Sequence, residues 1–290
     1  NAPPITAARN SKLKVVGTSQ LINNPKPARR KKSEDGKIQN PKSKACGERS
    51  ESIQNPKSDY LMKEFDVVVV GAGPAGGHCA RLLAKSGYQV LLAEQHENFS
   101  KNNFYSAATP IETLEKFDLL LEVVASFWQK IAIVTTNVSQ SWESQKTLGA
   151  VFNFAKLREF LAGEVKIYGG EVWLGCRYIN YSQEKGKTLV YLKQRGDHTI
   201  TISTKVLVDA TGYARAIMYE NQKNKPSFLR GTGIEYLIEV EEKEYKKYAN
   251  ALTFFMGYQW IPKGYSWIFP MDNNQLKVGA AWLNERHKII

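Results

Sequence analysis

Apolar positions first gather into a regular pattern at Phe65. Four consecutive β-branched residues, Val67 to Val70, are typical of a parallel strand buried on both faces. Residues 75–84 have helical spacing and are followed by Lys85-Ser86-Gly87, a basic last turn with a terminal glycine. A further apolar run, Tyr88 to Ala93, predicts another strand. These segments predict a strand, a helix and a second strand in succession.

Downstream, the pattern predicts two more helices and many strands. Helices are expected over residues 111–124 and 154–165, where apolar residues recur at helical spacing. Strands are expected over residues 130–136 and 205–209, in a meander over 171–174, 188–192 and 199–203, and over 234–240, 252–258, 265–270 and 276–282.

The turn between the first strand and the first helix is rich in glycine. It reads Gly71-Ala-Gly-Pro-Ala-Gly76, which fits the dinucleotide fingerprint. Gly71 permits the tight turn, Gly73 lets the backbone approach a pyrophosphate, and Gly76 lets the helix pack close to the strand. The helix N-terminus would then hold the diphosphate with its free N–H groups and its dipole.

The second strand is followed by an acidic residue, Glu94. A carboxylate at this point can accept hydrogen bonds from both ribose hydroxyls of an adenosine. The plainer interpretation is a glycine-rich turn followed by a surface glutamate. We favour the nucleotide site because strand, turn, helix, strand and acid occur in the expected order.

The run Lys205 to Asp209 continues into Ala210-Thr211-Gly212, whose small residues would admit a cofactor close to the backbone. A nucleotide-binding βαβ unit, a later meander and this Ala-Thr-Gly end form the pattern of FAD-binding enzymes of the two-dinucleotide type. We therefore predict an α/β fold, with a Rossmann-like FAD-binding domain that includes the three-stranded meander, plus an antiparallel substrate-domain sheet. The expected cofactor-binding residues are Gly71, Ala72, Gly73, Pro74, Ala75, Gly76, Glu94, Asp209 and Gly212.

Aromatic residues cluster in the expected C-terminal sheet. Strands that carry Tyr265, Trp267 and Phe269 can form an apolar wall over the flavin and contact the substrate. The alternative is an ordinary sheet core, since aromatic residues dominate cores as well as pockets.

The net charge of +12 lies mostly at the N-terminus. Residues 1–60 carry 13 Lys+Arg and 5 Asp+Glu, which gives +8 and leaves +4 for the remaining 230 residues. The basic run Arg29 to Lys32 could touch anionic lipid or nucleic acid, but a solvated tail is the favoured interpretation. We expect this tail to be disordered and dispensable for folding, and we expect no nucleic-acid partner.

The isolated cysteines favour a reducing compartment, and the sequence shows no membrane or export signal. The chain has no apolar run of 18 residues, so no membrane-spanning helix is predicted, and no signal peptide is visible. The cysteines Cys46, Cys79 and Cys176 are isolated, which favours neither a disulfide framework nor a metal site. We expect a cytoplasmic protein, with peripheral contact to a membrane left open.

At these residues the chain resembles the geranylgeranyl reductase family of FAD-dependent oxidoreductases and, more distantly, the lycopene cyclases. The resemblance covers about residues 64–285. The reductases' opening motif matches the glycine turn and the acid after it. Their Gly-Tyr-x-Trp-x-Phe-Pro motif matches Gly264 to Pro270, and the following Val-Gly strand matches Lys277 to Ala280. Residues 209–215 and 102–104 look more like the cyclases.

The resemblance implies a flavoenzyme that reduces double bonds of an apolar isoprenoid substrate. Its cofactor would be FAD, with a reduced donor such as NADPH or ferredoxin. Cyclisation needs acidic residues to protonate an alkene, and the cyclases' Glu-Glu pair would fall in the region of residues 278–281, which carries no carboxylate here. This favours reduction, for which a general acid is required, although the sequence identifies no catalytic residue. A lycopene cyclase-like carotenoid enzyme, a flavin monooxygenase or halogenase, and an inactive FAD-binding fragment remain as alternatives.

The resemblance also sets an expectation about length. The family's Gly-Asp motif, which would follow the aromatic strands and contact the ribityl and diphosphate groups, does not occur before Ile290. We therefore expect a chain truncated within its FAD domain. The expected division is a disordered basic tail over residues 1–62, an FAD-binding domain over 63–230 and an incomplete substrate-domain sheet over 231–290.

Overall fold

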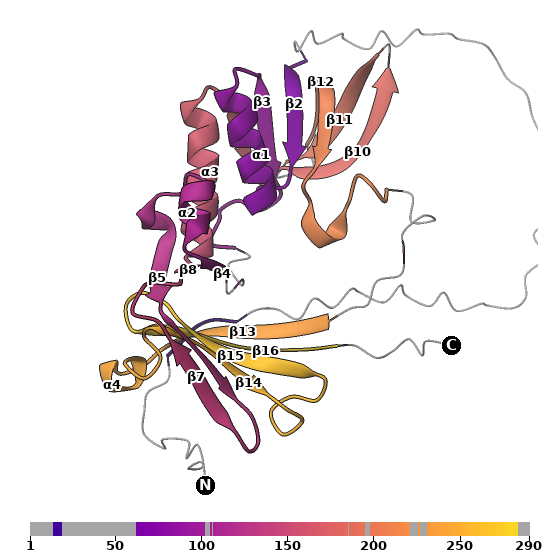
Figure 1. Cartoon of the computed structure of the whole chain (residues 1–290). Coiled ribbons are helices and arrows are strands. Elements are labelled where there is room, and N and C mark those ends of the chain that lie inside the picture. The colour runs from indigo at the N-terminus through magenta and orange to yellow at the C-terminus, as the bar shows by residue number, and fades with distance from the viewer. Residues whose placement is uncertain are drawn as a thin grey trace, which may run out of the picture.

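The computed structural model describes residues 14–18, 62–101, 105, 107–184, 186–194, 198–220, 226 and 231–283, with the backbone alone described for 14–18. Within these residues, three sheets and two long helices make a mixed α/β structure (Figure 1). The first sheet has six strands and the second has seven, and a small third sheet lies between them. The predicted fold class is confirmed.

The first sheet has the strand order β10-β11-β12-β2-β3-β9. Strands β12, β2, β3 and β9 run parallel, whereas β10, β11 and β12 form an antiparallel meander. Their bounds are β2 (Glu64–Val70), β3 (Val90–Glu94), β9 (Glu171–Leu174), β10 (Arg177–Glu184), β11 (Lys187–Lys193) and β12 (Thr199–Asp209).

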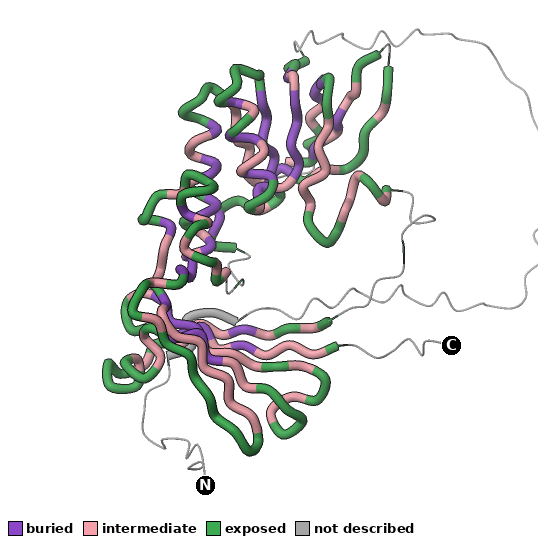
Figure 2. Tube along the Cα trace, in the orientation of Figure 1, coloured by how far each residue is buried: buried purple, intermediate pink, exposed green. Residues whose placement is uncertain are grey.

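Both faces of β2 are buried, which explains its unbroken valine run. Val67 and Val69 pack against the two long helices, and Val68 and Val70 pack on the opposite face against the meander. The helices are α1 (Pro74–Lys85) and α3 (Phe154–Ile167). In Figure 2 the buried segments concentrate in these helices and in the strands beside them. Packing on both faces therefore holds β2 in place, and the glycine turn follows directly after this buried strand.

Two of the predicted strands pair differently from the prediction. Residues 171–174 were expected to begin the meander, but β9 instead pairs in parallel with β3 at the sheet edge. The meander begins with β10, which has mostly exposed, polar side chains and so shows no apolar alternation. The runs over 199–203 and 205–209 form one continuous strand, β12.

The second sheet has the strand order β1-β13-β16-β15-β14-β6-β7. Neighbouring strands are antiparallel, except for the parallel pair β14 and β6. The bounds are β6 (Lys130–Val134), β7 (Ser139–Glu143), β13 (Gly231–Glu239), β14 (Ala251–Met256), β15 (Gly264–Pro270) and β16 (Gln275–Leu283). Because β6 and β7 belong to it, this sheet is not built from residues 231–290 alone, and the expected boundary at residue 230 is corrected.

The seventh strand comes from the expected tail. Strand β1 comprises Lys14–Thr18 and pairs antiparallel with β13. The prediction of disorder over residues 1–62 is therefore wrong for these five residues, because backbone pairing to a sheet edge needs no apolar periodicity. Residues 1–13 and 19–61 lie outside the described residues, as do the cyclase-like residues 102–104.

The third sheet has the order β4-β8-β5, and the helix predicted between β4 and β5 is shorter than expected. The segment 111–124 is helical only over α2 (Glu112–Lys116) and the 3-10 turn η1 (Leu121–Val123). Asp118 has φ 48°, a left-handed conformation that ends a right-handed helix. The sheet comprises β4 (Ala108–Pro110), β5 (Val124–Trp128) and β8 (Gly149–Phe152), and the remaining short helices are η3 (Gly212–Ala214) and α4 (Glu242–Tyr245).

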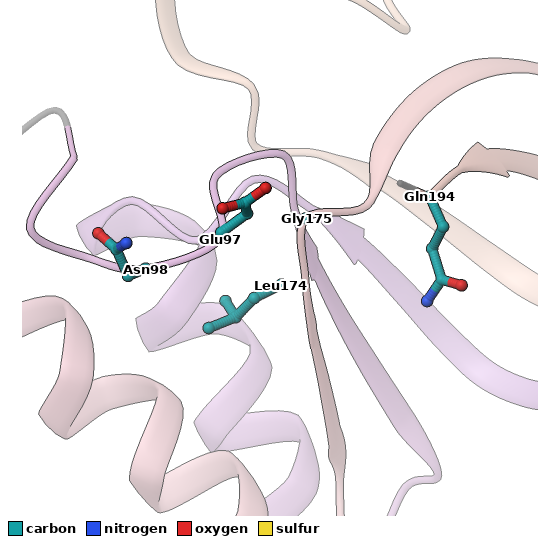
Figure 3. A pocket seen from close by; sticks show the side chains of 5 residues that line it. All are labelled: Glu97, Asn98, Leu174, Gly175 and Gln194. Atoms are coloured by element: carbon teal, nitrogen blue, oxygen red, sulfur yellow. The ribbon is translucent and has the colours of Figure 1, made fainter. Parts of the chain in front are cut away.

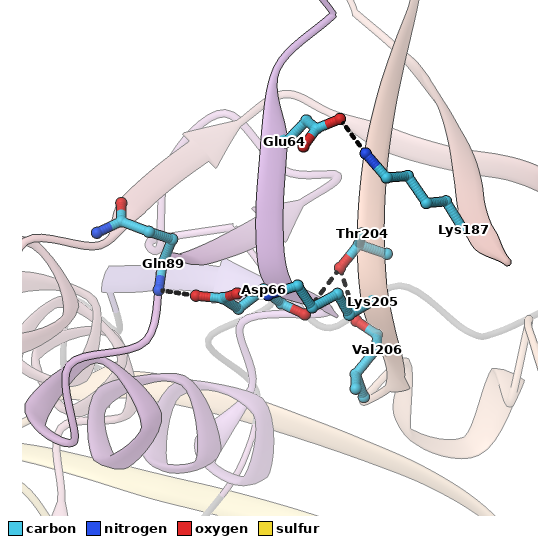
Figure 4. Close-up of polar contacts among 7 residues, drawn as sticks. All are labelled: Glu64, Asp66, Gln89, Lys187, Thr204, Lys205 and Val206. Atoms are coloured by element: carbon cyan, nitrogen blue, oxygen red, sulfur yellow. Dashed lines mark hydrogen bonds and ion pairs between the residues drawn. The ribbon is translucent and has the colours of Figure 1, made fainter.

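Polar contacts close the amino end of the first sheet (Figure 4). The Asp66 carboxylate accepts hydrogen bonds from the Gln89 backbone N–H at 2.9 Å and from Lys205 Nζ at 2.7 Å. The bond from Lys205 is the main cause that lowers the pKa of Asp66. A second exposed pair joins Lys187 to Glu64. These contacts lie at the end of the strands opposite to the glycine turn, so they contribute to the sheet and not to the site.

Candidate cofactor site

The glycine turn connects the carboxyl end of β2 to α1. Gly71 has φ 104°, and a Cβ there would lie 2.3 Å from the Ala210 carbonyl oxygen. A Cβ at Gly76 would lie 1.9 Å from the Gly71 carbonyl oxygen. Both positions therefore require glycine because the protein packs against them. Apart from its chain neighbours, no atom of the described residues lies within 4 Å of a Cβ at Gly73, so the space beside this residue is open among the described residues.

The first turn of α1 is suited to an anion. The N-cap is Gly73 and Pro74 occupies the first turn, and among the described residues no side chain caps the free N–H groups. The first turn also carries no acidic residue. Uncapped N–H groups and the positive end of the helix dipole together favour a bound phosphate.

Glu94 lies beside this turn, and its carboxylate is hydrogen-bonded to the turn's backbone. Oε2 accepts from the Ala72 backbone N–H at 2.9 Å, and Oε1 accepts from the His96 backbone N–H at 3.0 Å. The residue is only 5% exposed. A carboxylate oxygen can accept two hydrogen bonds, so among the described contacts Oε1 keeps room for a further donor. The prediction placed Glu94 beside the glycine turn, and the structure brings the two together.

Arg158 on α3 supplies the positive charge beneath the turn. Its Nη2 lies 3.3 Å from Glu94 Oε2, its Nε donates to the Ala72 carbonyl at 2.9 Å, and its Nη1 donates to the Lys101 carbonyl at 3.1 Å. Its guanidinium also lies over the Phe99 ring, 5.0 Å from the centroid. Burial lowers the pKa of Arg158, and the Glu94 charge partly opposes this. Arg158 therefore fixes both the acid and the turn, a role that sequence reasoning missed.

A pocket of about 500 Å³ opens where β9 ends, at Leu174 and Gly175 (Figure 3). Leu174 is the direct neighbour of Glu94 in the parallel pair of β3 and β9, and the backbone N–H of Cys176 donates to the Glu94 carbonyl at 2.8 Å. The pocket thus adjoins the end of the strand on which the acid lies. Its lining residues are Glu97, Asn98, Leu174, Gly175 and Gln194.

Asp209 organises the loop after β12. Its Oδ1 accepts from the backbone N–H and the hydroxyl of Thr211, and its Oδ2 accepts from the backbone N–H groups of Ile217 and Met218. Burial alone would raise the pKa of Asp209, but these hydrogen bonds outweigh it and leave the pKa lowered. The carboxylate therefore holds the loop together, and its predicted contact with the cofactor stays a prediction. Gly212, at φ 66°, begins the exposed part of this loop, and within the described part of the chain no atom beyond its neighbours lies within 4 Å of a Cβ there.

The three predicted substrate residues share one face of the second sheet. Tyr265, Trp267 and Phe269 alternate along β15, and Phe254 on β14 contacts the rings of Tyr265 and Phe269. We call this the inner face, because it also contacts Tyr105 in the segment before β4. The arrowheads of β2 and β12 in Figure 1 point toward this sheet. Phe269, at 6% exposed, belongs to the core, whereas Tyr265 is 44% exposed and its contact with a substrate stays a prediction.

A sequence model of FAD-dependent oxidoreductases matches residues 66–219. The chain belongs to the FAD-dependent oxidoreductase family. The match runs from β2 through the glycine turn, Glu94 and Arg158 to the Asp209 loop. It therefore contains the parts of the site described above that would hold the cofactor, whereas the aromatic strand β15 lies beyond it. The conformation of that site agrees with the family's cofactor, since the open space at Gly73 and the uncapped helix are what a diphosphate requires.

Proteins with similar sequences include reductases of isoprenoid lipids. The chain is 30% identical to a digeranylgeranylglycerophospholipid reductase of Haloferax volcanii, over 79% of this chain and 56% of the relative. It is 24% identical to a protein of the same name from Methanocella arvoryzae, over 79% of this chain and 59% of the relative. The chain therefore spans between half and three fifths of the length of these curated relatives.

Solved structures share the fold. A geranylgeranyl bacteriochlorophyll reductase-like protein from Thermoplasma acidophilum matches with a TM-score of 0.67 at 21% identity, covering 76% of this chain and 57% of that one. A myxobacterial FAD-dependent chondrochloren halogenase matches with a TM-score of 0.61 at 15% identity, covering 77% and 54%. Reductase-like and halogenase proteins thus have the same architecture, and the fold alone does not separate them.

Proposed function

We propose that this chain forms the FAD-binding and substrate-facing part of an enzyme that reduces carbon–carbon double bonds of an isoprenoid lipid. The observation that carries the proposal is the pairing of two features. One is a glycine turn with open space at Gly73, and the other is an aromatic inner face. The sequence similarity to digeranylgeranylglycerophospholipid reductases supports the same substrate class.

Different residues of the site would bind different parts of FAD. The diphosphate of FAD would lie at the first turn of α1 beside Gly73, and its adenosine ribose would donate to Glu94. The adenine would enter the adjoining pocket near Leu174 and Gln194. Bound FAD supplies the hydride chemistry, and the protein supplies placement and an apolar surface.

The inner face favours reduction over cyclisation. Strand β16 carries no carboxylate at residues 278–281, and the buried carboxylate on this face, Glu235 on β13, is paired with Lys277. A carboxylate held by a lysine in an ion pair is a poor proton donor to an alkene. The electron donor, NADPH or ferredoxin, stays a prediction.

A lipid substrate implies contact with a membrane surface. Among the residues that the structure describes, no helix is both long and apolar enough to cross a bilayer. We propose peripheral contact, in which the apolar chain of the substrate reaches the inner face from the lipid.

The test starts with the purified chain and free FAD. We expect flavin absorbance to stay with the protein after gel filtration. Dithionite-driven turnover of a lipid with geranylgeranyl chains should then add one H₂ per reduced double bond, as mass spectrometry would show. Flavin binding with oxygen consumption on NADPH addition and no lipid reduction would favour a monooxygenase or halogenase. A chain that never retains flavin would contradict the cofactor assignment.

A further inference from the structure

The inner face carries a buried pair of charges among its aromatic side chains. Glu235 on β13 and Lys277 on β16 are 6% and 2% exposed, and Lys277 Nζ lies 3.5 Å from Glu235 Oε1. Burial lowers the pKa of Lys277, and the Glu235 charge only partly opposes this. A buried ion pair is often no more stabilising than apolar residues of similar size. Stability alone therefore does not explain why this pair lies here.

Glu235 belongs to a row of residues that crosses three strands. Gly279 on β16 pairs with Glu235 on one side and with Trp267 on the other, so the three positions lie on the same face. A Cβ at Gly279 would lie 2.2 Å from Trp267 Cζ2, so the indole occupies the space over this glycine. The indole thus reaches across β16, and its Nε1–H donates to Glu235 Oε2 at 3.0 Å.

Lys277 connects this row to the rest of the chain. Its Nζ donates to the backbone carbonyl of Tyr105, in the segment before β4. The Tyr105 ring packs against Phe154 at the start of α3, with 4.8 Å between the ring centroids. Contacts therefore run without a break from the indole of Trp267 to the helix that carries Arg158.

We infer that Glu235 and Lys277 are positioning residues for the proposed reduction. Glu235 holds the Trp267 indole flat across Gly279, and Lys277 holds the Glu235 carboxylate in place. The fixed indole is the surface against which an isoprenoid chain lies, and the pair acts on the substrate only through it. This inference rests on the proposed function, because it assumes an apolar chain on the inner face.

The first test needs neither flavin nor substrate. The full chain is labelled with ¹⁵N-tryptophan, and the indole N–H signal of Trp267 is assigned by its loss in Trp267→Phe. The double variant Glu235→Leu/Lys277→Leu removes both charges, so no lone charge stays buried and the melting temperature should remain close to that of the wild type. We expect the indole N–H to exchange with solvent about tenfold faster in this variant, as loss of one hydrogen bond to a charged group implies. An unchanged exchange rate in a folded double variant would overturn the inference.

The second test uses FAD-loaded chain reduced with dithionite, with geranylgeraniol as the probe substrate. We expect Glu235→Leu/Lys277→Leu to raise KM about tenfold while FAD affinity is unchanged. Trp267→Phe should raise KM similarly, and combining all three substitutions should add little, because residues that act through one contact are not additive. The exposed Glu239→Gln on the same strand is the control. A stable double variant with wild-type KM would refute the positioning role. If the wild type reduces nothing, the proposed function fails and the exchange experiment decides the inference by itself.

Discussion

Gly73 differs from the other two glycines of its turn in what surrounds it. Gly71 and Gly76 are held by backbone atoms that leave no room for a side chain, so the fold itself requires them. Gly73 has φ −73°, which any residue adopts, and open space beside it. The fold does not require glycine at this position, so we expect the requirement to come from the bound diphosphate.

Substituting Gly73 by valine should separate folding from cofactor binding. We expect Gly73→Val to fold with a melting temperature close to that of the wild type. Its FAD affinity should fall about a hundredfold, because the branched side chain keeps the diphosphate from charge-assisted hydrogen bonds worth about 1.5–3 kcal/mol each. Gly71→Val is the matched control and should fail to fold. A valine variant that copurifies with stoichiometric flavin would contradict the diphosphate assignment.

Glu94 should matter more for FAD than its neighbour Glu97. Alanine at position 94 would leave buried Arg158 with neither a charge partner nor an acceptor, at a cost of about 3–5 kcal/mol, whereas glutamine keeps an acceptor oxygen of the same shape and is the better substitution. We expect Glu94→Gln to raise the Kd of FAD about tenfold, since one carboxylate oxygen becomes an amide donor that cannot accept from the ribose. Glu97→Gln, at the pocket wall, should change it less. Titration followed by flavin fluorescence measures both, and equal affinities would remove Glu94 from the ribose site.

At the scale of residues, the sequence predicted contacts between residues close in the chain and missed a contact between residues far apart in it. The roles of Gly71, Gly76 and Glu94 follow from one strand, one turn and one helix, and the structure brings these residues together as expected. Arg158 could not be predicted, because it lies on a helix far along the chain and reaches the turn only through packing of α3 on α1. An arginine on an otherwise apolar helix face was its only signal in the sequence.

The loop after β12 depends on one carboxylate. Asp209 accepts four hydrogen bonds, from Thr211, Ile217 and Met218. Ala210 at its start packs against Gly71 and Gly76, so the loop supports the glycine turn. The acid therefore acts on the site through the element that it folds.

Asp209→Asn should destabilise this loop. The amide NH₂ would face two backbone donors in place of an oxygen, so we expect a loss of about 2 kcal/mol in the free energy of unfolding at neutral pH. The pKa of Asp209 is lowered in the folded chain, so its contribution is fully present above the ordinary value of 3.8 and is lost as the pH falls through the lower folded value. Urea titrations between pH 7 and pH 3 should therefore show the gap between wild type and variant closing in acid. The control is Asp272→Asn, and a gap independent of pH would contradict this account.

At the scale of elements, strands with long apolar runs were predicted, whereas polar strands and the short strands of the third sheet, including the buried β8, were not. β2, β3 and β13 to β16 carry apolar runs, and the structure has strands at each of these positions. β10 is polar on most of its surface, and β1 joins a sheet edge through backbone pairing. Neither of these two strands has an alternating apolar pattern in the sequence. Which neighbour a strand pairs with depends on the path of the chain between the two strands, and an apolar pattern does not show that path. Residues 171–174 were therefore predicted in the meander, whereas β9 pairs in parallel with β3.

At the scale of the whole molecule, one core joins the third sheet to the second. Trp128 and Val151 pack with Leu252, Phe269 and Met271 in a single buried cluster. The Ser126 hydroxyl adds a hydrogen bond to the Pro270 carbonyl at 2.7 Å. The third sheet also packs against α3, which belongs to the first sheet's core. Thermal unfolding should therefore involve all three sheets together.

Calorimetry with and without FAD tests this coupling. FAD at one hundred times its Kd should stabilise the folded chain by about 2.7 kcal/mol, and a domain of this size gains about 2–4 °C in Tm per kcal/mol. If the three sheets unfold as one unit, a single transition moves upward by several degrees, although the proposed diphosphate and ribose site lies beside the first sheet. Phe269→Ala removes a ring from the shared core at a cost of about 3–5 kcal/mol and should divide the transition into two, of which only one responds to FAD. Tyr258→Ala, at a residue that is 72% exposed, should leave the single transition intact. Two transitions in the wild type, with only one shifted by FAD, would mean that the sheets fold independently.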